Sequence, residues 1–322
     1  MSDQNQKPNQ VNHFVTGGAG FIGSHLIEKL LKSGRDRVTA YDNLSLGHIE
    51  NINPYLTNKN FEFIKEDLLD FEKLKEAMKG HSIVWHFGAN TNIPKGNEIT
   101  DVDLKNCTIA TRNVLEAMKQ LGIDRILFPS SSTVYGDKGL AYLSEKDGPL
   151  LPTSLYGAGK LACEGLISAY SCLFGIKALM FRFGNVVGSR MDHGVIFDFI
   201  QKLKKNPQEL LILGDGEQHK NFFTVEDCLD GIFYTLEHSD KQCDVYNLGS
   251  DSFAFVTKIG QIVTEEMGLK DVKFKYTGGK SGWLGDVPVV RYDIGKIKKL
   301  GWQPKYTSEE AVRVACQRLL EE

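Results

Sequence analysis

The sequence predicts an α/β fold, with a doubly wound parallel sheet and a smaller α+β carboxyl-terminal domain. Two observations lead to this prediction. Short apolar runs alternate with helix-length segments through the first half of the 322-residue chain, as expected where helices join parallel strands. A glycine-rich turn, residues 16–23, lies between the apolar run Asn12–Val15 and the helical pattern Phe21–Leu31. In such a sheet the ligand crevice lies at the carboxyl ends of the strands.

The glycine-rich turn has the spacing of a phosphate-binding turn. Gly17, Gly20 and Gly23 recur every three residues. The first allows a tight turn, the second lets backbone approach a pyrophosphate, and the third packs helix against strand. The amides of Phe21 and Ile22 begin the helix and face the phosphates, where the helix dipole favours negative charge. The pattern therefore predicts dinucleotide binding.

An acidic residue follows at the distance expected of a ribose-binding carboxylate. Asp42 lies about 20 residues beyond the glycines, at the end of the apolar run Val38–Tyr41, and Asn43 comes next. A carboxylate there accepts hydrogen bonds from ribose hydroxyls and repels a 2′-phosphate, and no arginine follows immediately. We therefore predict NAD rather than NADP. The alternative is an Asp-Asn pair that only initiates a turn.

The later pattern predicts the remaining elements. We expect a disordered polar tail at residues 1–11. Further strands are expected at Phe61–Lys65, Ile83–Phe87, Ile126–Pro129, Leu210–Leu213 and Asp244–Gly249. Helices are expected at Phe71–Met78, Val102–Leu121, Leu155–Phe174, Gly194–Lys205, Glu226–Leu236 and Ser308–Glu321, with further elements at Val256–Met267, Val272–Lys275 and Asp293–Leu300. We place the nucleotide-binding domain at residues 12–181, joined by about 222–250, and the second domain at 182–221 and 251–322.

Two segments at strand ends are candidates for cofactor contacts. Asp67 and Leu68 follow one strand, and Asp67 is suited to bind an adenine amino group or, alternatively, to cap the next helix. Phe87, Gly88 and Ala89 follow another strand. The small residues among them leave room for backbone beside the nicotinamide half of the cofactor.

A third set of residues is a candidate for catalysis. Ser131, Ser132 and Thr133 place hydroxyl groups where the next strand ends. Tyr156 and Lys160 are four residues apart on a predicted helix, so they share one face. An ammonium so close lowers a tyrosine pKa that is normally ~10, and bound NAD⁺ would add a second positive charge, which makes Tyr156 a candidate general base. The alternative is a chance pair on a solvated face, but the dinucleotide turn and the hydroxyl cluster favour catalysis.

The bulk properties exclude several classes of protein. The formal net charge of -3 gives no basic surface, which argues against nucleic acid as the main partner. No run of 18 apolar residues and no signal-peptide pattern occurs, so we expect a cytoplasmic protein without a membrane partner. The six cysteines form no Cys-x-x-Cys pair and the eight histidines show no ligand spacing. We therefore expect reduced thiols and no metal.

Seven motifs occur in the order and at the intervals of one family: TGGAGFIGSH, DNLSLG, HFGAN, SSSTVYG, YGAGK, RFGNVVG and GDGEQHKNFFTVEDC. On these motifs the chain, from residue 12 to residue 320, resembles the extended short-chain dehydrogenase/reductase family and, within it, the nucleotide-sugar epimerase/dehydratase group. The resemblance implies a modified Rossmann domain that holds NAD and a smaller domain that holds a nucleotide-diphospho sugar. It also implies a homodimer formed through Val102–Leu121 and Leu155–Phe174.

The resemblance assigns roles to individual residues. Tyr156 is the catalytic tyrosine, Lys160 is its partner and also a cofactor contact, and Ser131 is the active-site hydroxyl. The cofactor-binding residues are Gly17, Gly20, Phe21, Ile22, Gly23, Asp42, Asn43, Asp67, Leu68, Phe87, Gly88, Ala89, Asn106, Tyr156 and Lys160. The substrate-binding residues are Ser131, Ser132, Thr133, Asn185 and Lys220.

The implied reaction is inversion of C4 of a UDP-glucose or UDP-galactose type sugar through a transient 4-keto sugar. Dehydratases and decarboxylases of this group usually carry glutamate where Thr133 stands, so Ser132 and Thr133 favour plain epimerisation. Lys220 and Trp283 replace arginines that usually bind the pyrophosphate, which leaves the nucleotide and the sugar open. Two alternatives are a 4-dehydrogenase or reductase acting on a GDP-linked, dTDP-linked, uronic acid or N-acetyl sugar, and a non-catalytic NAD-binding protein.

Overall fold

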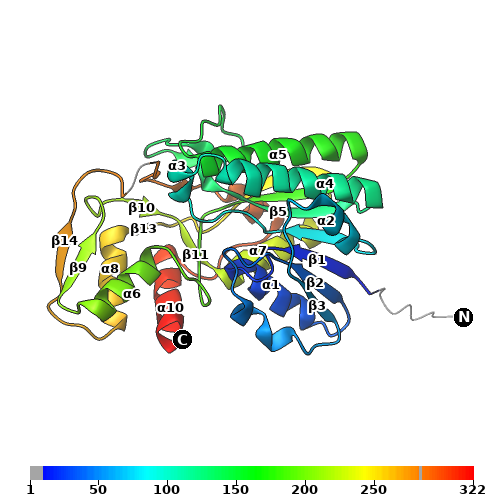
Figure 1. Ribbon diagram of the computed structural model, residues 1–322. Coiled ribbons are helices and arrows are strands. Elements are labelled where there is room, and N and C mark those ends of the chain that lie inside the picture. The colour runs from blue at the N-terminus through cyan, green and yellow to red at the C-terminus, as the bar shows by residue number, and fades with distance from the viewer. Residues whose placement is uncertain (1–9, 283–284) are drawn as a thin grey trace, which may run out of the picture.

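A parallel sheet flanked by helices forms the larger part of the molecule, as the computed structural model in Figure 1 shows. The structure describes residues 10–282 and 285–322, so Trp283 and most of the expected tail lie outside the described residues. Within them, seven parallel strands pair in the order β12-β7-β5-β4-β1-β2-β3. Their bounds are β1 (Asn12–Thr16), β2 (Arg37–Tyr41), β3 (Phe61–Ile64), β4 (Ile83–His86), β5 (Arg125–Ser131), β7 (Lys177–Phe183) and β12 (Cys243–Leu248). The predicted doubly wound parallel sheet is therefore confirmed.

Helices cover both faces of this sheet. Successive strand residues point to opposite faces, so Val15 of β1 packs with α1 (Phe21–Leu31) and α7 (Val225–His238). Phe14 points to the other face, which α2 (Phe71–Ala77), α4 (Ala110–Leu121) and α5 (Leu155–Phe174) cover. Both side chains are fully buried. The carboxyl ends of the strands are thereby left as the edge where a ligand can reach the backbone.

The smaller part of the molecule has a core of its own. This core contains α6 (Val195–Lys205), α8 (Val256–Glu266) and α10 (Ser308–Glu321), which pack together. Short paired strands complete it, namely β8 (Asn185–Val187) with β11 (Phe222–Thr224), β9 (Glu209–Ile212) with β14 (Lys273–Tyr276), and β10 (His219–Lys220) with β13 (Ala254–Phe255). Figure 1 shows these elements beside the main sheet.

Residues close to the carboxyl terminus also pack on the main sheet. Tyr292 of β15 (Arg291–Tyr292) belongs to the same apolar cluster as Val15, and β15 pairs with β6 (Tyr142–Leu143). Trp302, just after α9 (Gly295–Leu300), belongs to that cluster as well. The domain limits given above stay a prediction. None of the helices in the described ranges 10–282 and 285–322 has the length and apolar character needed to cross a membrane.

Two differences between the expected and the observed elements concern residues that line the cavity described below. The helix expected at Val102–Leu121 is wrong as a regular α-helix, because a π-helix occupies Leu104–Ile109 before α4 begins. The wider π-turn leaves Asn106 on a cavity wall while Cys107 is buried against Cys163 of α5. Strand β5 continues to Ser131, beyond the expected end, because its last residues pair with β7.

Candidate active site

A cavity of about 840 Å³ opens where the sheet strands end, and it extends to α6 of the smaller part. Every residue assigned above to cofactor or substrate binding lines this cavity, although the residues come from many separate segments of the chain. The structure therefore brings the whole predicted set together. The roles of the individual residues stay a prediction at this point.

The glycine-rich turn forms a backbone cradle at one wall of the cavity. Gly17 has φ +67°, and a Cβ there would lie 2.7 Å from the amide nitrogen of Gly88. A Cβ at Gly23 would collide with the carbonyl oxygen of Gly17. Gly20 is less crowded, with its nearest contact at 3.3 Å, and it faces the cavity. The turn and the start of α1, which has no acidic residue in its first turn, fit the pyrophosphate of NAD.

Asp42 organises the loop that follows β2. One of its carboxylate oxygens accepts a hydrogen bond from the Ala19 amide at 3.1 Å, and the other accepts one from the Leu44 amide at 2.8 Å. Burial raises the pKa of Asp42, although both amides oppose that effect. Asp42 therefore initiates a turn, and its role in binding the ribose stays a prediction. Each oxygen keeps a second lone pair and Asp42 lines the cavity, so the carboxylate can also accept a hydrogen bond from a ribose hydroxyl.

Asp67 and Asn43 also contact each other at the cavity wall. The Asn43 side chain donates to Asp67 Oδ2 at 2.8 Å, and Asp67 Oδ1 accepts from the Leu69 amide at 2.8 Å. The helix cap of α2 is Asp70, whose side chain accepts from Lys73. The cap alternative for Asp67 is therefore wrong, and its local role is to hold the turn after β3.

A buried chain of polar side chains lies beneath the cradle. His86 is fully buried, with Nδ1 2.8 Å from Thr16 Oγ1 and Nε2 2.9 Å from Thr111 Oγ1. Burial lowers the pKa of His86 to about 3, so the ring is neutral. The Thr16 hydroxyl also accepts the Gly88 amide at 3.0 Å. These hydrogen bonds hold the end of β1 against the end of β4, beside the glycine-rich turn.

The candidate catalytic residues come from β5 and α5. Ser154 begins α5 as its cap and accepts the Gly157 amide at 3.1 Å, which sets the register of Tyr156 and Lys160. The Lys160 ammonium donates to the carbonyl oxygen of Pro129 at 2.7 Å and lies 5.7 Å from the centroid of the Tyr156 ring. Ser131 ends β5. The three side chains converge on one wall of the cavity.

Lys160 alone does not lower the pKa of Tyr156 below its ordinary value. Burial raises the pKa of Tyr156, and the Lys160 charge and a hydrogen bond with Ser131 only partly oppose that effect. Burial would lower the pKa of Lys160, but Tyr156 and nearby Cys107 raise it, so its ammonium is retained. Proton removal by Tyr156 therefore needs a further positive charge in the cavity.

Lys220, which is predicted to bind the diphosphate of the substrate, already forms an ion pair with Asp286. Lys220 Nζ lies 2.5 Å from Asp286 Oδ1, and the Asp286 side chain is only 5% exposed. Asn185, on the neighbouring β8, donates from its side chain to the carbonyl oxygen of Asn221 at 3.0 Å. Lys220 therefore offers a phosphate less charge than an unpaired lysine would.

The sequence analysis missed several polar residues of the cavity wall. Arg190, Asp192 and His193 belong to the loop before α6, and Lys202 belongs to α6 itself. Lys95 comes from α3 (Lys95–Glu98). The only available signal was the position of Arg190 shortly after the RFGNVVG motif, and it did not indicate which side of the loop faces the cavity.

Comparisons with known proteins agree with this arrangement. Residues 13–249 match the model of a family described as the NAD dependent epimerase/dehydratase family. A putative UDP-glucose 4-epimerase of Methanocaldococcus jannaschii is 34% identical over 308 residues, which cover 93% of this chain and 95% of that protein. A crystal structure of a UDP-galactose 4-epimerase has a TM-score of 0.86 at 37% identity, covering 97% of this chain and 99% of that chain. The UDP-glucuronic acid 4-epimerase of Bacillus cereus, solved with UDP-glucuronic acid and NAD, has a TM-score of 0.86 at 28% identity and the same coverage.

Proposed function

The chain belongs to the NAD-dependent epimerase/dehydratase family, and on that basis we propose that it inverts C4 of a nucleotide-diphospho sugar of the UDP-glucose or UDP-galactose type. The observation that carries the proposal is the convergence of Ser131, Tyr156 and Lys160 on the cavity that the glycine-rich turn lines. The relatives reported above are named as epimerases of UDP-sugars, which supports a UDP-sugar as the substrate.

Each catalytic side chain has a defined task in this proposal. Tyr156 removes the proton from the sugar 4-hydroxyl, and the Ser131 hydroxyl binds the same oxygen. When bound, NAD⁺ supplies the hydride acceptor and donor for C4 together with a positive charge. The Lys160 ammonium stabilises the phenolate against the burial that raises the pKa of Tyr156. The 4-keto sugar turns within the cavity and is protonated on its oxygen by Tyr156 after reduction on the opposite face.

The residues beside Ser131 favour epimerisation over dehydration or decarboxylation. The latter reactions need an added acid and base, and positions 132 and 133 hold hydroxyl groups instead. The Thr133 hydroxyl donates to Ser131 Oγ at 3.0 Å, and its amide donates to the same oxygen at 3.2 Å. Thr133 thereby orients the Ser131 hydroxyl.

One experiment tests the proposed reaction. The purified protein, without added NAD, is incubated with UDP-, GDP- and dTDP-linked hexoses, uronic acids and N-acetyl sugars, and each mixture is followed by proton NMR and by absorbance of NADH. We expect conversion of one sugar to its C4 epimer without free NADH. Accumulation of a 4-keto sugar with NADH would replace the proposal by a dehydrogenase. Bound NAD with no conversion of any sugar would favour a non-catalytic protein.

We also propose a homodimer formed through the π-helix, α4 and α5. Exposed apolar side chains support this proposal: Leu104 and Ile109 on the π-helix and Leu173 on α5, of which Leu173 is 71% exposed. Light scattering after gel filtration should give twice the chain mass, and Leu173→Glu should shift it towards the monomer. A monomeric wild-type protein would contradict the dimer and would leave the proposed reaction untouched.

A further inference from the structure

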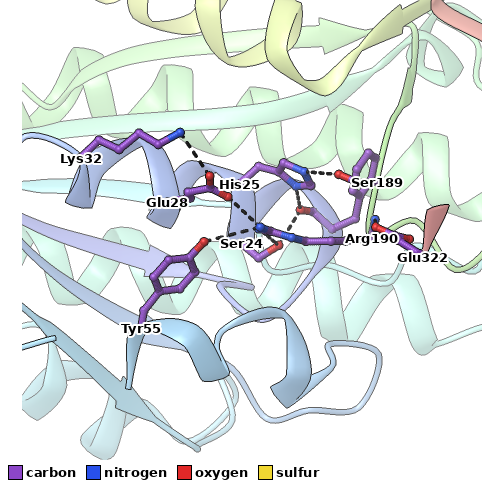
Figure 2. A network of polar contacts seen from close by, with 9 residues as sticks. Ser24, His25, Glu28, Lys32, Tyr55, Ser189, Arg190 and Glu322 are labelled. Atoms are coloured by element: carbon purple, nitrogen blue, oxygen red, sulfur yellow. Dashed lines mark hydrogen bonds and ion pairs between the residues drawn. The ribbon is translucent and has the colours of Figure 1, made fainter. Parts of the chain in front are cut away.

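The loop between β8 and α6 is tied to α1 by a cluster of polar contacts that Figure 2 shows from close by. The Arg190 guanidinium is at its centre. One of its nitrogens lies 2.7 Å from Glu28 Oε2 and 3.5 Å from the Tyr55 hydroxyl, and the other lies 3.4 Å from Ser24 Oγ. The side chains of Arg190 and Glu28 are 24% and 32% exposed, so the ion pair is partly shielded from water.

The backbone conformation of Arg190 is one that its side chain must help to hold. Arg190 has φ +63°, in the left-handed region that glycine enters readily and other residues enter at a cost. Its amide donates to Glu322 Oε1 at 2.9 Å. An arginine persists in such a conformation only where its surroundings hold it, and here they do so through the contacts to α1.

A second, neutral contact joins the same two segments. His25 of α1 lies with Nδ1 2.9 Å from the carbonyl oxygen of Phe21 and Nε2 3.0 Å from Ser189 Oγ. A carbonyl oxygen only accepts, so Nδ1 carries the proton and Nε2 accepts from the Ser189 hydroxyl. Burial lowers the pKa of His25, which favours this neutral ring.

Both of the tied segments line the cavity. The start of α1 (residues 20–23) lines it on the side of the glycine-rich turn, and residues 190–196 line it on the side of α6. A third contact, His48 Nε2 to Asp192 Oδ2 at 2.7 Å, joins the loop after β2 to the same loop before α6. One short loop therefore reaches both the wall that fits NAD and the wall that leads to the smaller part.

We propose that Arg190 is a positioning residue, whose ion pair with Glu28 holds the substrate-side loop against the pyrophosphate helix α1 and so retains NAD and aligns the nucleotide sugar. The inference deepens the proposed function and rests on NAD and a nucleotide sugar sharing this cavity. Arg190 acts through the loop and α1, because its guanidinium is occupied by Glu28, Ser24 and Tyr55.

The test compares four variants as NAD-loaded proteins freed of excess cofactor by gel filtration. Arg190→Gly removes the side chain and relieves the strained backbone, so we expect this variant to fold. Glu28→Gln removes the other partner, and Arg190→Lys keeps the charge. Arg313→Gln is the matched control, since Arg313 pairs with Glu265 at 2.7 Å on the surface and does not line the cavity.

Exchange of bound NAD for deuterated NAD is followed by mass spectrometry, and UDP binding by calorimetry. We expect about tenfold faster exchange and about tenfold weaker UDP binding in Arg190→Gly and Glu28→Gln, the change expected of a partly shielded ion pair. Arg190→Lys should recover part of both, and Arg313→Gln should match the wild type. With the substrate identified, KM should rise about tenfold while kcat stays within about twofold.

Wild-type exchange and UDP binding in Arg190→Gly would overturn the proposal. Equal losses in Arg313→Gln would overturn it too, because a general loss of stability would then explain both. Neither readout depends on turnover, so an error in the proposed reaction leaves them interpretable. A failure of the Arg190 proposal can therefore be told apart from a failure of the proposed epimerase reaction.

Discussion

Replacing Glu164 by leucine should destabilise the fold far more than replacing Glu164 and Arg182 together. The two side chains form a buried ion pair behind the catalytic strand, with Arg182 Nη2 2.7 Å from Glu164 Oε2 and Nε 3.0 Å from Oε1. Ser130 donates to the same Oε1 at 2.5 Å. The charged side chains are 5% and 8% exposed, and the guanidinium lies 4.7 Å from the centroid of the Tyr135 ring.

The magnitude follows from this burial. Removing one partner leaves the other charge without compensation in a site closed to water, which costs about 3–5 kcal/mol. Removing both and filling the space with apolar groups restores most of that loss, because no buried charge then remains. We therefore expect Glu164→Leu and Arg182→Met each to cost about 3–5 kcal/mol, and the double variant to cost less than either.

Urea unfolding at a fixed NAD concentration, followed by tryptophan fluorescence and circular dichroism, measures these free energies where both probes coincide. Lys79→Met is the control, since the ion pair of Lys79 with Glu76 is exposed and should contribute only about 0.2–1 kcal/mol. A double variant that loses the sum of the two single losses would refute the reasoning. Single variants that lose no more than the control would refute it as well.

Three further predictions test the site. Tyr156→Phe should lower turnover by about 10²–10⁴-fold with bound NAD unchanged, as NMR assay and cofactor extraction would show; normal turnover would remove Tyr156 from the reaction. Gly17→Ala should abolish NAD retention on gel filtration, whereas Gly34→Ala, at the same φ of +67° but with open space around it, should retain NAD; equal retention would contradict the cradle. Burial raises the pKa of Glu28, but hydrogen bonds from Arg190, Lys32 and Tyr55 outweigh burial and lower it from 4.5 to about 2. The ion pair with Arg190 therefore stabilises the fold above pH 4.5, and this stabilisation is lost as the pH falls towards 2. The stability difference between the wild type and Arg190→Gly should therefore shrink from pH 5 to about 3 in urea unfolding, and a constant difference would contradict the low pKa.

Strong local signals made the order of elements predictable from the sequence. Helix α5 begins and ends at the expected residues, because Ser154 caps its first turn and Gly175 ends it in the left-handed conformation. The π-helix at Leu104–Ile109 could not be predicted, because its cause is tertiary. The wide turn is fixed by what lies on either side of it, with Asn106 on the cavity and Cys107 in the core, and apolar spacing alone describes a continuous α-helix there.

The candidate site shows the same division between local and tertiary information. Residues placed at strand ends, such as Gly17, Asp42 and Ser131, were predictable because the parallel sheet brings those ends together. The pKa of Tyr156 was not, because spacing on a helix reveals the neighbouring charge of Lys160 but not the burial that outweighs it. Arg190 was not predictable either, since its partner Glu28 lies 162 residues earlier in the chain. A charged residue with so distant a partner leaves no periodic pattern in the sequence. The role proposed for Arg190 follows only from the two segments that it joins in the folded chain.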